Sequence, residues 1–383
     1  MQNSNRVYFS IDPEDRKIVI PVHLSDSITA NMVFDTGAFL GTFILDSAWI
    51  LKHPSYVPSD IIPDTVSAGS SWSNYGMHAL KYKDYYRTIK LGNEFLYYDR
   101  LLTFNWKYHM GTKTDGLFNI PENDTTHVWE FNFENNYLEI HPVSSFIMPQ
   151  DCFMLNIEKN EYYPFTVNIP MYIKSTDGDT LSMNYQYFFD SGASDDIGFF
   201  YNYEPKFFKN RKDVVWTETP YGYKYHSTVT ATLFDSLTLD SLRIYTFSRL
   251  SNEHAKCLIG LNFFKRFNVF FDLQKQKIGL QPIKNFQRLV NPNYKRFFYW
   301  SIRNSEGKNN IVFIADYKEN YFKSAGLQVG DELVMINNIL VEKLTREQRY
   351  KFFDMDTLFY DIIREGKPLK ILIPVDKNFM HGD

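Results

Sequence analysis

Two tripeptides in this 383-residue chain place an aspartate next to a hydroxyl residue and a glycine. They are Asp35-Thr36-Gly37 and Asp190-Ser191-Gly192, and each follows two apolar residues. A single such tripeptide arises by chance in roughly one chain in five of this length, as an Asx-turn closed by glycine. Chance is a poor account of two copies in matching surroundings. We therefore predict that Asp35 and Asp190 form a catalytic pair.

Paired carboxylates can hydrolyse an amide bond without a metal or a covalent intermediate. One acts as a base that activates water, and the other as an acid toward the substrate carbonyl. Two carboxylates about 3 Å apart cannot both ionise, so they share a proton and supply both functions. The hydroxyls of Thr36 and Ser191 can hydrogen-bond to the opposite loop. Gly37 and Gly192 let the backbone approach each carboxylate closely.

The tripeptides lie at matching positions of an internal repeat. Strand-like runs containing Ile20-Pro21-Val22 and Ile169-Pro170-Met171 precede them, and each run continues through a polar turn into a second strand that ends in the aspartate. His127–Pro142 and Phe267–Pro282 match as two-strand hairpins. Frequent turns and many aromatic and β-branched residues favour strands. The two β lobes that we expect span residues 1–142 and 143–283.

Residues 1–283 resemble the pepsin and retropepsin group of aspartic proteases. Phe34–Ala38 and Phe189–Ala193 correspond to the catalytic loops of that group, and Leu258-Ile259-Gly260 corresponds to an apolar-apolar-glycine motif packed behind the loop. Leu117-Phe118-Asn119 takes that place in the first half, with asparagine as the next best residue after glycine for positive φ. The resemblance implies an all-β bilobal fold of two related β-barrel lobes, and an endopeptidase that acts on peptides or proteins.

Alanine follows the glycine in both loops, at Ala38 and Ala193. Pepsin-like members usually carry a hydroxyl there, which lowers the pKa of the carboxylate by hydrogen bonding. The resemblance therefore points to the retroviral type, with activity at mildly acidic to near-neutral pH. Because two internal lobes supply what retroviral enzymes obtain by dimerising, we expect a monomer.

The family also closes a β-hairpin flap over its substrate. The best candidate is the segment 67–76, which contains Trp72 and Tyr75, and its counterpart in the second lobe contains Tyr221. Small residues suit a mobile tip, and aromatic side chains can cover a peptide. An ordinary surface hairpin is the alternative interpretation of both segments.

Residues 284–383 are expected to form a small β-rich α+β domain. The segment Ser324–Asn338 resembles the PDZ core pattern, with glycine and asparagine turns around a strand at 332–336. A closing strand is expected at 367–374. Residues 345–364 are expected to form an amphipathic helix, and the apolar residues of one face are Phe352, Met355, Phe359 and Ile362.

PDZ domains bind extended peptides by strand addition beside a loop that captures a terminal carboxylate. Here that loop falls at Phe297, Phe298 and Tyr299, which are our candidates for a peptide groove. The loop contains no glycine, so substrate steering or simple packing against the protease are the alternatives to carboxylate capture. A second function also stays open, in which an inactive protease-like protein binds peptides through this domain.

Composition excludes several other classes of protein. The chain is 44% hydrophobic and 17% aromatic, enough for packed cores, and its net charge of −4 comes from well-mixed charges with no basic block for nucleic acid. No apolar run approaches the ~18 residues of a membrane span. Metal-binding and nucleotide-binding motifs are absent, so neither a metal nor a cofactor is expected.

Three further points are left open by the sequence. No signal peptide is visible at the start, so the protein is cytoplasmic, or extracytoplasmic if such a segment has been removed. Cys152 and Cys257 allow one disulfide or two free thiols. Asp195-Asp196, just after the second loop, is a solvated turn or a cation site.

Overall fold

The computed structural model of the chain is nearly all β, and its helices are short, as in α1 (Ser47–Lys52), α4 (Leu261–Phe264) and the 3-10 turn η1 (Val341–Lys343). The residues that the structure describes are 5–12, 16–57, 64–68, 77–104, 106, 113–158, 160, 163–175, 178–194, 196–199, 215–219, 222–247, 257–284, 286, 299–303, 309–313, 315–316, 324–344, 348, 351–352 and 355–374. Among these residues no helix has the length and apolar character needed to cross a membrane.

The first lobe is a barrel of strands in the order β3-β4-β9-β5-β8-β7, closed by pairing of β3 with β7. Its strands are β3 (Ile18–Ser25), β4 (Ile28–Phe34), β5 (Phe43–Asp46), β7 (Met77–Leu91), β8 (Glu94–Phe104) and β9 (Gly116–Phe118). Two further strands, β2 (Ser10–Ile11) and β6 (Asp64–Ala68), pair with β3 and β7. The β4–β9 and β5–β8 pairs are parallel.

The second lobe repeats this barrel strand for strand, in the order β13-β14-β19-β15-β18-β17, closed by pairing of β13 with β17. Its strands are β13 (Thr166–Ser175), β14 (Thr180–Asp190), β15 (Ile197–Phe199), β17 (Gly222–Leu233), β18 (Leu237–Phe247) and β19 (Cys257–Gly260), with β16 (Val215–Thr219) paired to β17. The β14–β19 and β15–β18 pairs are parallel, as their counterparts are in the first barrel. The duplicated plan predicted from the sequence is therefore seen in the strand order itself.

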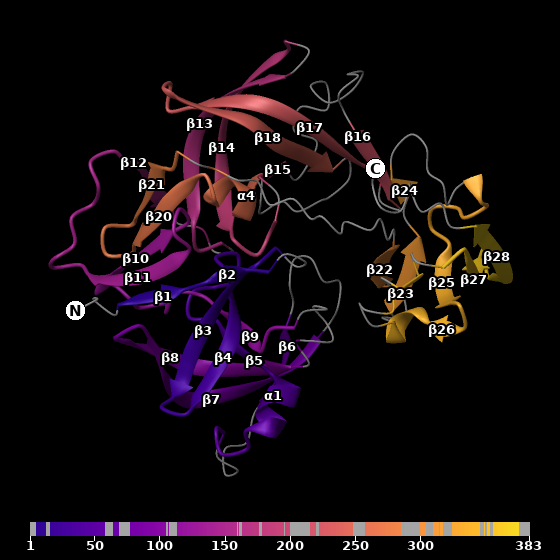
Figure 1. Ribbon diagram of the computed structural model, residues 1–383, viewed down its shortest axis with the longest axis horizontal. Helices are drawn as coiled ribbons and strands as arrows, with labels where there is room; N and C mark the ends of the chain where they lie inside the picture. Colours follow the sequence, from indigo (N-terminus) through magenta and orange to yellow (C-terminus); the bar gives the residue numbers. More distant parts are fainter. Residues whose placement is uncertain are drawn as a thin grey trace.

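A sheet between the barrels joins them (Figure 1). Its order is β1 (Arg6–Tyr8), β11 (Tyr137–Pro142), β10 (His127–Asn132), β20 (Phe267–Asp272), β21 (Lys277–Pro282) and β12 (Phe153–Glu158). The two predicted hairpins, β10–β11 and β20–β21, meet at its centre, where Phe131 lies opposite Val269. These sheets confirm the predicted all-β bilobal aspartic-protease fold.

One apolar core runs through both barrels and the joining sheet. Strand β13 shows how the sequence builds it, because its residues alternate between buried and exposed positions, as expected for a half-buried strand. Aromatic rings connect the lobes: Phe34 contacts Phe131 with centroids 4.3 Å apart, and Phe131 meets Phe271 at 6.0 Å. Phe271 in turn meets Phe165 of the second lobe at 4.8 Å. This chain of rings begins at the residue before Asp35.

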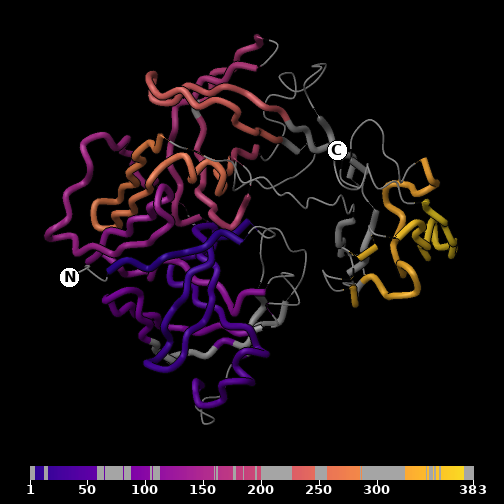
Figure 2. The backbone as a smooth tube through the Cα atoms, viewed as in Figure 1, coloured from indigo at the N-terminus to yellow at the C-terminus, as the bar shows by residue number. Residues whose placement is uncertain are grey.

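The C-terminal residues form a separate sheet with its own small core, which lies to one side of the two lobes (Figures 1 and 2). Its strands are β22 (Tyr299–Arg303), β23 (Asn309–Phe313), β25 (Glu332–Ile336), β26 (Ile339–Leu340), β27 (Thr357–Arg364) and β28 (Lys367–Pro374). The expected strands at 332–336 and 367–374 are confirmed, and Gly326, Gly330, Asn337 and Asn338 all have positive φ, as their turns require. A two-residue strand, β24 (Ala315–Asp316), pairs with β16 of the second lobe.

The expected helix over 345–364 is wrong in its second half. Residues 357–364 form β27, which pairs with β25 on one side and β28 on the other. Leu358, Tyr360 and Ile362 are buried while Phe359 is 60% exposed, which is the period-2 pattern of a strand. The helical spacing of Phe352, Met355, Phe359 and Ile362 was therefore coincidental across this boundary.

Candidate active site

Asp35 and Asp190 end equivalent strands of the two barrels. Asp35 directly follows β4, and Asp190 is the last residue of β14. Behind each lies the parallel strand of its own lobe, with Phe34 opposite Phe118 and Phe189 opposite Ile259. The same local fold therefore delivers both aspartates to the interface between the lobes.

The two loops meet face to face. A Cβ atom added to Gly37 would lie 2.6 Å from Cγ of Asp190, and one added to Gly192 would lie 2.7 Å from Cγ of Asp35. Each glycine thus faces the carboxyl of the other loop, where any side chain would collide. The two carboxyls lie close enough that the charge of Asp35 raises the pKa of Asp190. The backbone N–H groups of Gly37 and Ala193 donate to Asp35 Oδ1 and Asp190 Oδ1, at 2.8 and 3.0 Å.

The side chains of Thr36 and Ser191 link the two catalytic loops by hydrogen bonds. The N–H of Thr36 donates to Oγ of Ser191 at 3.0 Å, and the N–H of Ser191 donates to Oγ1 of Thr36 at 2.9 Å. The Ser191 hydroxyl also donates to the carbonyl of Phe34 at 3.0 Å. Both side chains are buried, so these bonds are shielded from competing water. The distance between the two aspartates is therefore set by direct contacts between the lobes.

The electrostatic surroundings of the two acids differ. Burial, and then the neighbouring charge of Asp35, raise the pKa of Asp190 to about 8, while the charge of Lys17 acts in the opposite direction. Asp190 is only 7% exposed, whereas Asp35 is half-buried. The two acids therefore lie in unequal surroundings, and burial is the main cause of the raised pKa of Asp190.

Buried asparagines tie down both loops, and the sequence did not predict this. Nδ2 of Asn119 donates to the carbonyl of Ala38 at 2.7 Å, and its Oδ1 accepts from the N–H of Ile120 at 2.8 Å. In the second lobe, Nδ2 of Asn262 donates to the carbonyl of Ser194 at 2.8 Å. Asn119 is not among the residues with positive φ, so the interpretation that it replaces glycine for that reason is wrong. Its amide is a hydrogen-bonding group that glycine lacks.

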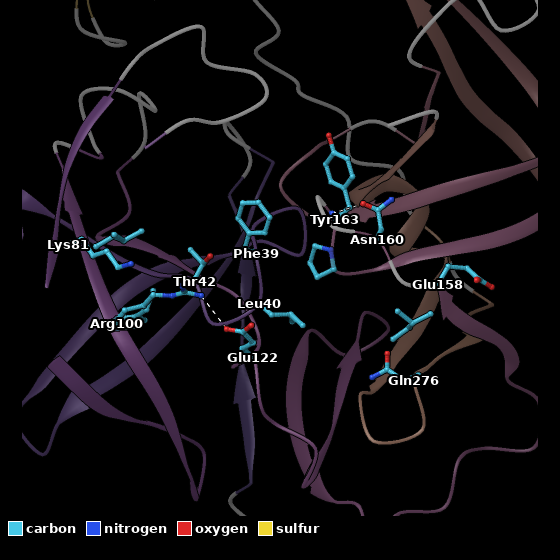
Figure 3. A pocket seen from close by; sticks show the side chains of 14 residues that line it. Phe39, Leu40, Thr42, Lys81, Arg100, Glu122, Glu158, Asn160, Tyr163 and Gln276 are labelled. Carbon is cyan, nitrogen blue, oxygen red and sulfur yellow. Dashed lines mark hydrogen bonds and ion pairs between the residues drawn. The ribbon is translucent and has the colours of Figure 1, made fainter. Parts of the chain in front are cut away.

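A cavity of about 970 Å³ lies beside the two loops, between the lobes (Figure 3). Phe39 and Leu40 extend into it from the first loop. Opposite stands Tyr163, which stacks on Phe188 with ring centroids 4.1 Å apart, in a cluster against which Ala193 of the second loop packs. The remaining lining residues are Thr42, Phe43, Lys81, Arg100, Leu102, Glu122, Ile157, Glu158, Asn160, Pro164 and Gln276. Its lining residues do not include Asp35 or Asp190, so the cavity adjoins the catalytic loops rather than the acids themselves. An apolar cavity with charged residues at its edges can hold part of a peptide chain.

The predicted flaps are only partly described. Strands β6 and β7 pair up to Ala68 and Met77, and β16 and β17 pair up to Thr219 and Gly222, so both segments lead into hairpins. Trp72, Tyr75 and Tyr221 lie outside the described residues, as do Phe297 and Phe298 of the proposed peptide groove. Tyr299 is the first residue of β22.

Asp196, which follows the second loop, does not lie in a solvated turn. It is fully buried and accepts a hydrogen bond from the N–H of Arg243 at 3.0 Å, with the Arg266 guanidinium 3.5 Å away. Its role is structural, as an ion pair inside the second barrel. Both cysteines are free thiols, so the sequence alternative of a disulfide is wrong.

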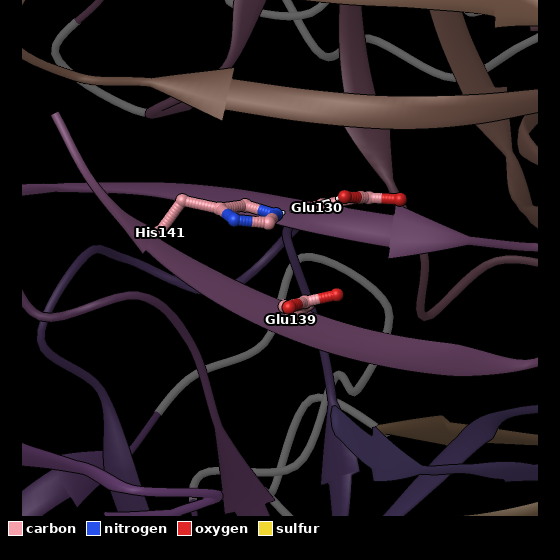
Figure 4. A group of neighbouring side chains, drawn as sticks. All are labelled: Glu130, Glu139 and His141. Atoms are coloured by element: carbon pink, nitrogen blue, oxygen red, sulfur yellow. Dashed lines mark hydrogen bonds and ion pairs between the residues drawn. The ribbon is translucent and has the colours of Figure 1, made fainter. Parts of the chain in front are cut away.

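Within the described part of the chain, Glu130, Glu139 and His141 are grouped closely enough to hold a metal ion (Figure 4). Each carboxylate already has partners. Glu130 accepts from Asn132, Tyr137 and His141, and Glu139 pairs with Arg6 at 2.9 Å. The group therefore serves as a polar network on the joining sheet.

Comparison with known proteins finds likenesses among solved structures. No family model matches the chain, and neither does any curated protein. A solved structure, an aspartic proteinase from Irpex lacteus, is similar over 72% of this chain and 96% of its own, with 12% identity and a TM-score of 0.46.

Proposed function

We propose that the protein is an aspartic endopeptidase, in which Asp35 and Asp190 activate one water molecule for attack on a peptide bond. The observation that carries this proposal is the meeting of the two carboxyls, each facing the glycine of the opposite loop. No role in folding requires two acids to be held together at a lobe interface, because burying them costs free energy. Two carboxyls that share a proton are useful only for acid–base catalysis, which needs a base and an acid together.

The two acids divide the work according to their surroundings. Asp35, the more exposed, is the base that takes a proton from water. Asp190, whose pKa is raised, is the acid that gives its proton to the substrate carbonyl as the water oxygen attacks. The product of this step is a tetrahedral diol. As it collapses, Asp35 gives the proton that it took from water to the nitrogen, Asp190 takes a proton from a diol hydroxyl, and the C–N bond breaks.

The surrounding structure supports a peptide substrate. The cavity that begins at Phe39 and Leu40, just after the first loop, is lined by aromatic and aliphatic side chains, with charged residues at its edges. We assign residues 1–142 and 143–283 to the two protease lobes and 284–383 to a PDZ-like module. Thr36, Gly37, Ser191 and Gly192 support the two acids, and Trp72, Tyr75 and Tyr221 are assigned to the flaps.

The test is cleavage of a peptide library across about pH 3 to pH 10, with Asp35→Asn, Asp190→Asn and a control variant, Asp26→Asn, in the exposed β3–β4 turn. Pepstatin-sensitive cleavage should fall by about 10²–10⁴-fold in each dyad variant and stay unchanged in the control. Cleavage should also decline above about pH 8, where Asp190 loses its proton. Absence of cleavage at every pH, by folded protein, would reject the proposal and favour a peptide-binding protein.

A further inference from the structure

The strand register places Lys17 opposite Asp35, one of the two acids. Strand β3 pairs with β4 so that Val19 lies opposite Val33, and continuing this register by two residues sets Lys17 opposite Asp35. Residues opposite each other in an antiparallel pair carry their side chains on the same face. Ile18 is buried in the barrel core, so the side chain of Lys17 turns to the other face, toward the lobe interface.

The backbone of Lys17 is held by the hairpin that precedes β3. Its carbonyl accepts a hydrogen bond from the N–H of Asp12 at 2.9 Å, and Ser10 and Ile11 of β2 pair with Val19 and Ile18. The lysine therefore extends from a fixed point rather than from a free end of the chain.

The ammonium group of Lys17, in the first lobe, contacts the catalytic loop of the second lobe. Nζ of Lys17 donates a hydrogen bond to the backbone carbonyl of Gly192, in the second loop. Gly192 is the residue that faces the carboxyl of Asp35. The positive charge thus lies at the second catalytic loop, where it acts on Asp190, while also joining that loop to the first lobe.

The second lobe has no matching cation. There, Thr166 lies opposite Phe188, and the same continuation by two residues sets Pro164 opposite Asp190. Pro164 carries no charge and lines the cavity instead. A single lysine, supplied by the first lobe, therefore faces a pair of acids supplied by both.

We propose that Lys17 is a positioning residue of the dyad, which ties the Gly192 loop to the first lobe and supplies the positive charge beside the two carboxyls. The charged groups that face Asp190 within the described residues are Asp35 and Lys17, and they act in opposite directions: Asp35 raises the pKa of Asp190, and Lys17 lowers it. Removal of Lys17 should therefore strengthen the hold on the shared proton. This inference rests on the proposed function for its kinetic consequence, but not for its effect on the carboxyls.

The kinetic test is the pH profile of kcat/KM for Lys17→Met, Lys17→Arg and Lys174→Met. Methionine keeps the aliphatic stem and removes the charge, and we expect the alkaline limb to move up by about 1 pH unit. Lys17→Arg, which keeps the positive charge, should return the alkaline limb to its wild-type position. Lys174, exposed at the far end of the β13–β14 ladder from Asp190, is the matched control and should leave the profile unchanged.

A second measurement separates this inference from the proposed function. Carboxyl ¹³C resonances of aspartate-labelled full-length protein report the titration of Asp190 whether or not the protein cleaves peptides, with Asp190→Asn giving the assignment. An upward shift of that titration in Lys17→Met supports the inference even if the wild type proves inactive. Identical titration in wild type and a folded Lys17→Met, or a shifted limb that Lys17→Arg does not restore, would overturn it.

Discussion

The two lobes share a strand order but not the surroundings of their aspartates. In the first lobe Asp35 is half-buried and has Lys17 across the strand pair. In the second, Asp190 is 7% exposed and has Pro164 in that position. A duplicated backbone therefore sets where the two carboxyls lie, and unequal side chains give the two carboxyls different surroundings.

The supports of the two loops are also unequal. Asn119 stands where the second lobe has Gly260, and its amide binds the Ala38 carbonyl directly. The second lobe obtains a similar bond from Asn262, two residues later in the chain, to Ser194. Equivalent loops are thus held by amides from different positions, which bind carbonyls one residue apart in the two loops.

The largest effect is expected where the lobes are most alike. Gly37→Ala and Gly192→Ala each place a Cβ within 2.7 Å of the opposing Cγ, so the carboxyl must move. Cleavage should fall by about 10³-fold in both variants. Gly178→Ala is the control, since its added Cβ meets nothing within 4 Å. It should cost about 1 kcal/mol of stability at its positive φ and leave kcat/KM unchanged. Full activity in either loop variant would contradict the dyad geometry.

The next effect separates the two acids by the pH dependence of stability. The pKa of Asp190 rises from 3.8 to about 8 on folding, so the folded protein holds a proton that the unfolded chain releases. The stability contributed by the neutral carboxyl is complete below about pH 4 and is lost as the pH rises through about 8.

Asp190→Asn removes this dependence, because an amide stays neutral. Relative to wild type, its stability (the free energy required to unfold it) should be about 2–4 kcal/mol greater at pH 8 than at pH 4.5, measured by urea denaturation. The exposed Asp26→Asn should show no such difference. A pH-independent difference for Asp190→Asn would show that its proton is not held on folding.

The smallest effect concerns the hydroxyls that join the lobes. Ser191 both accepts from the N–H of Thr36 and donates to the carbonyl of Phe34, whereas Thr36 accepts from the N–H of Ser191. Ser191→Ala should therefore destabilise by about 2–3 kcal/mol and Thr36→Val by about 1–2 kcal/mol in urea denaturation. Ser27→Ala, in an exposed turn, should change nothing measurable. Equal losses of stability in Ser191→Ala and Thr36→Val would mean that the two hydroxyls contribute equally to the contact between the loops.

Much of this molecule could be predicted from local pattern. The paired tripeptides, the repeated hairpins and the turns at Gly326 and Gly330 depend on residues close together in the chain, whose types restrict the backbone directly. Alternating apolar residues fixed the strands of both barrels for the same reason. The sequence by itself thus determined the duplicated β architecture and singled out the two acids.

Tertiary structure alone decided what surrounds those acids. Lys17 and Gly192 are 175 residues apart, and no local pattern marks a lysine that crosses between lobes. The same limit explains β27, since the apolar residues of 352–362 fit a helical and a strand period, and pairing with β25 and β28 selects the strand. Contacts between distant segments arise only when the sheets close, and these contacts set the charge and hydrogen bonding at the site.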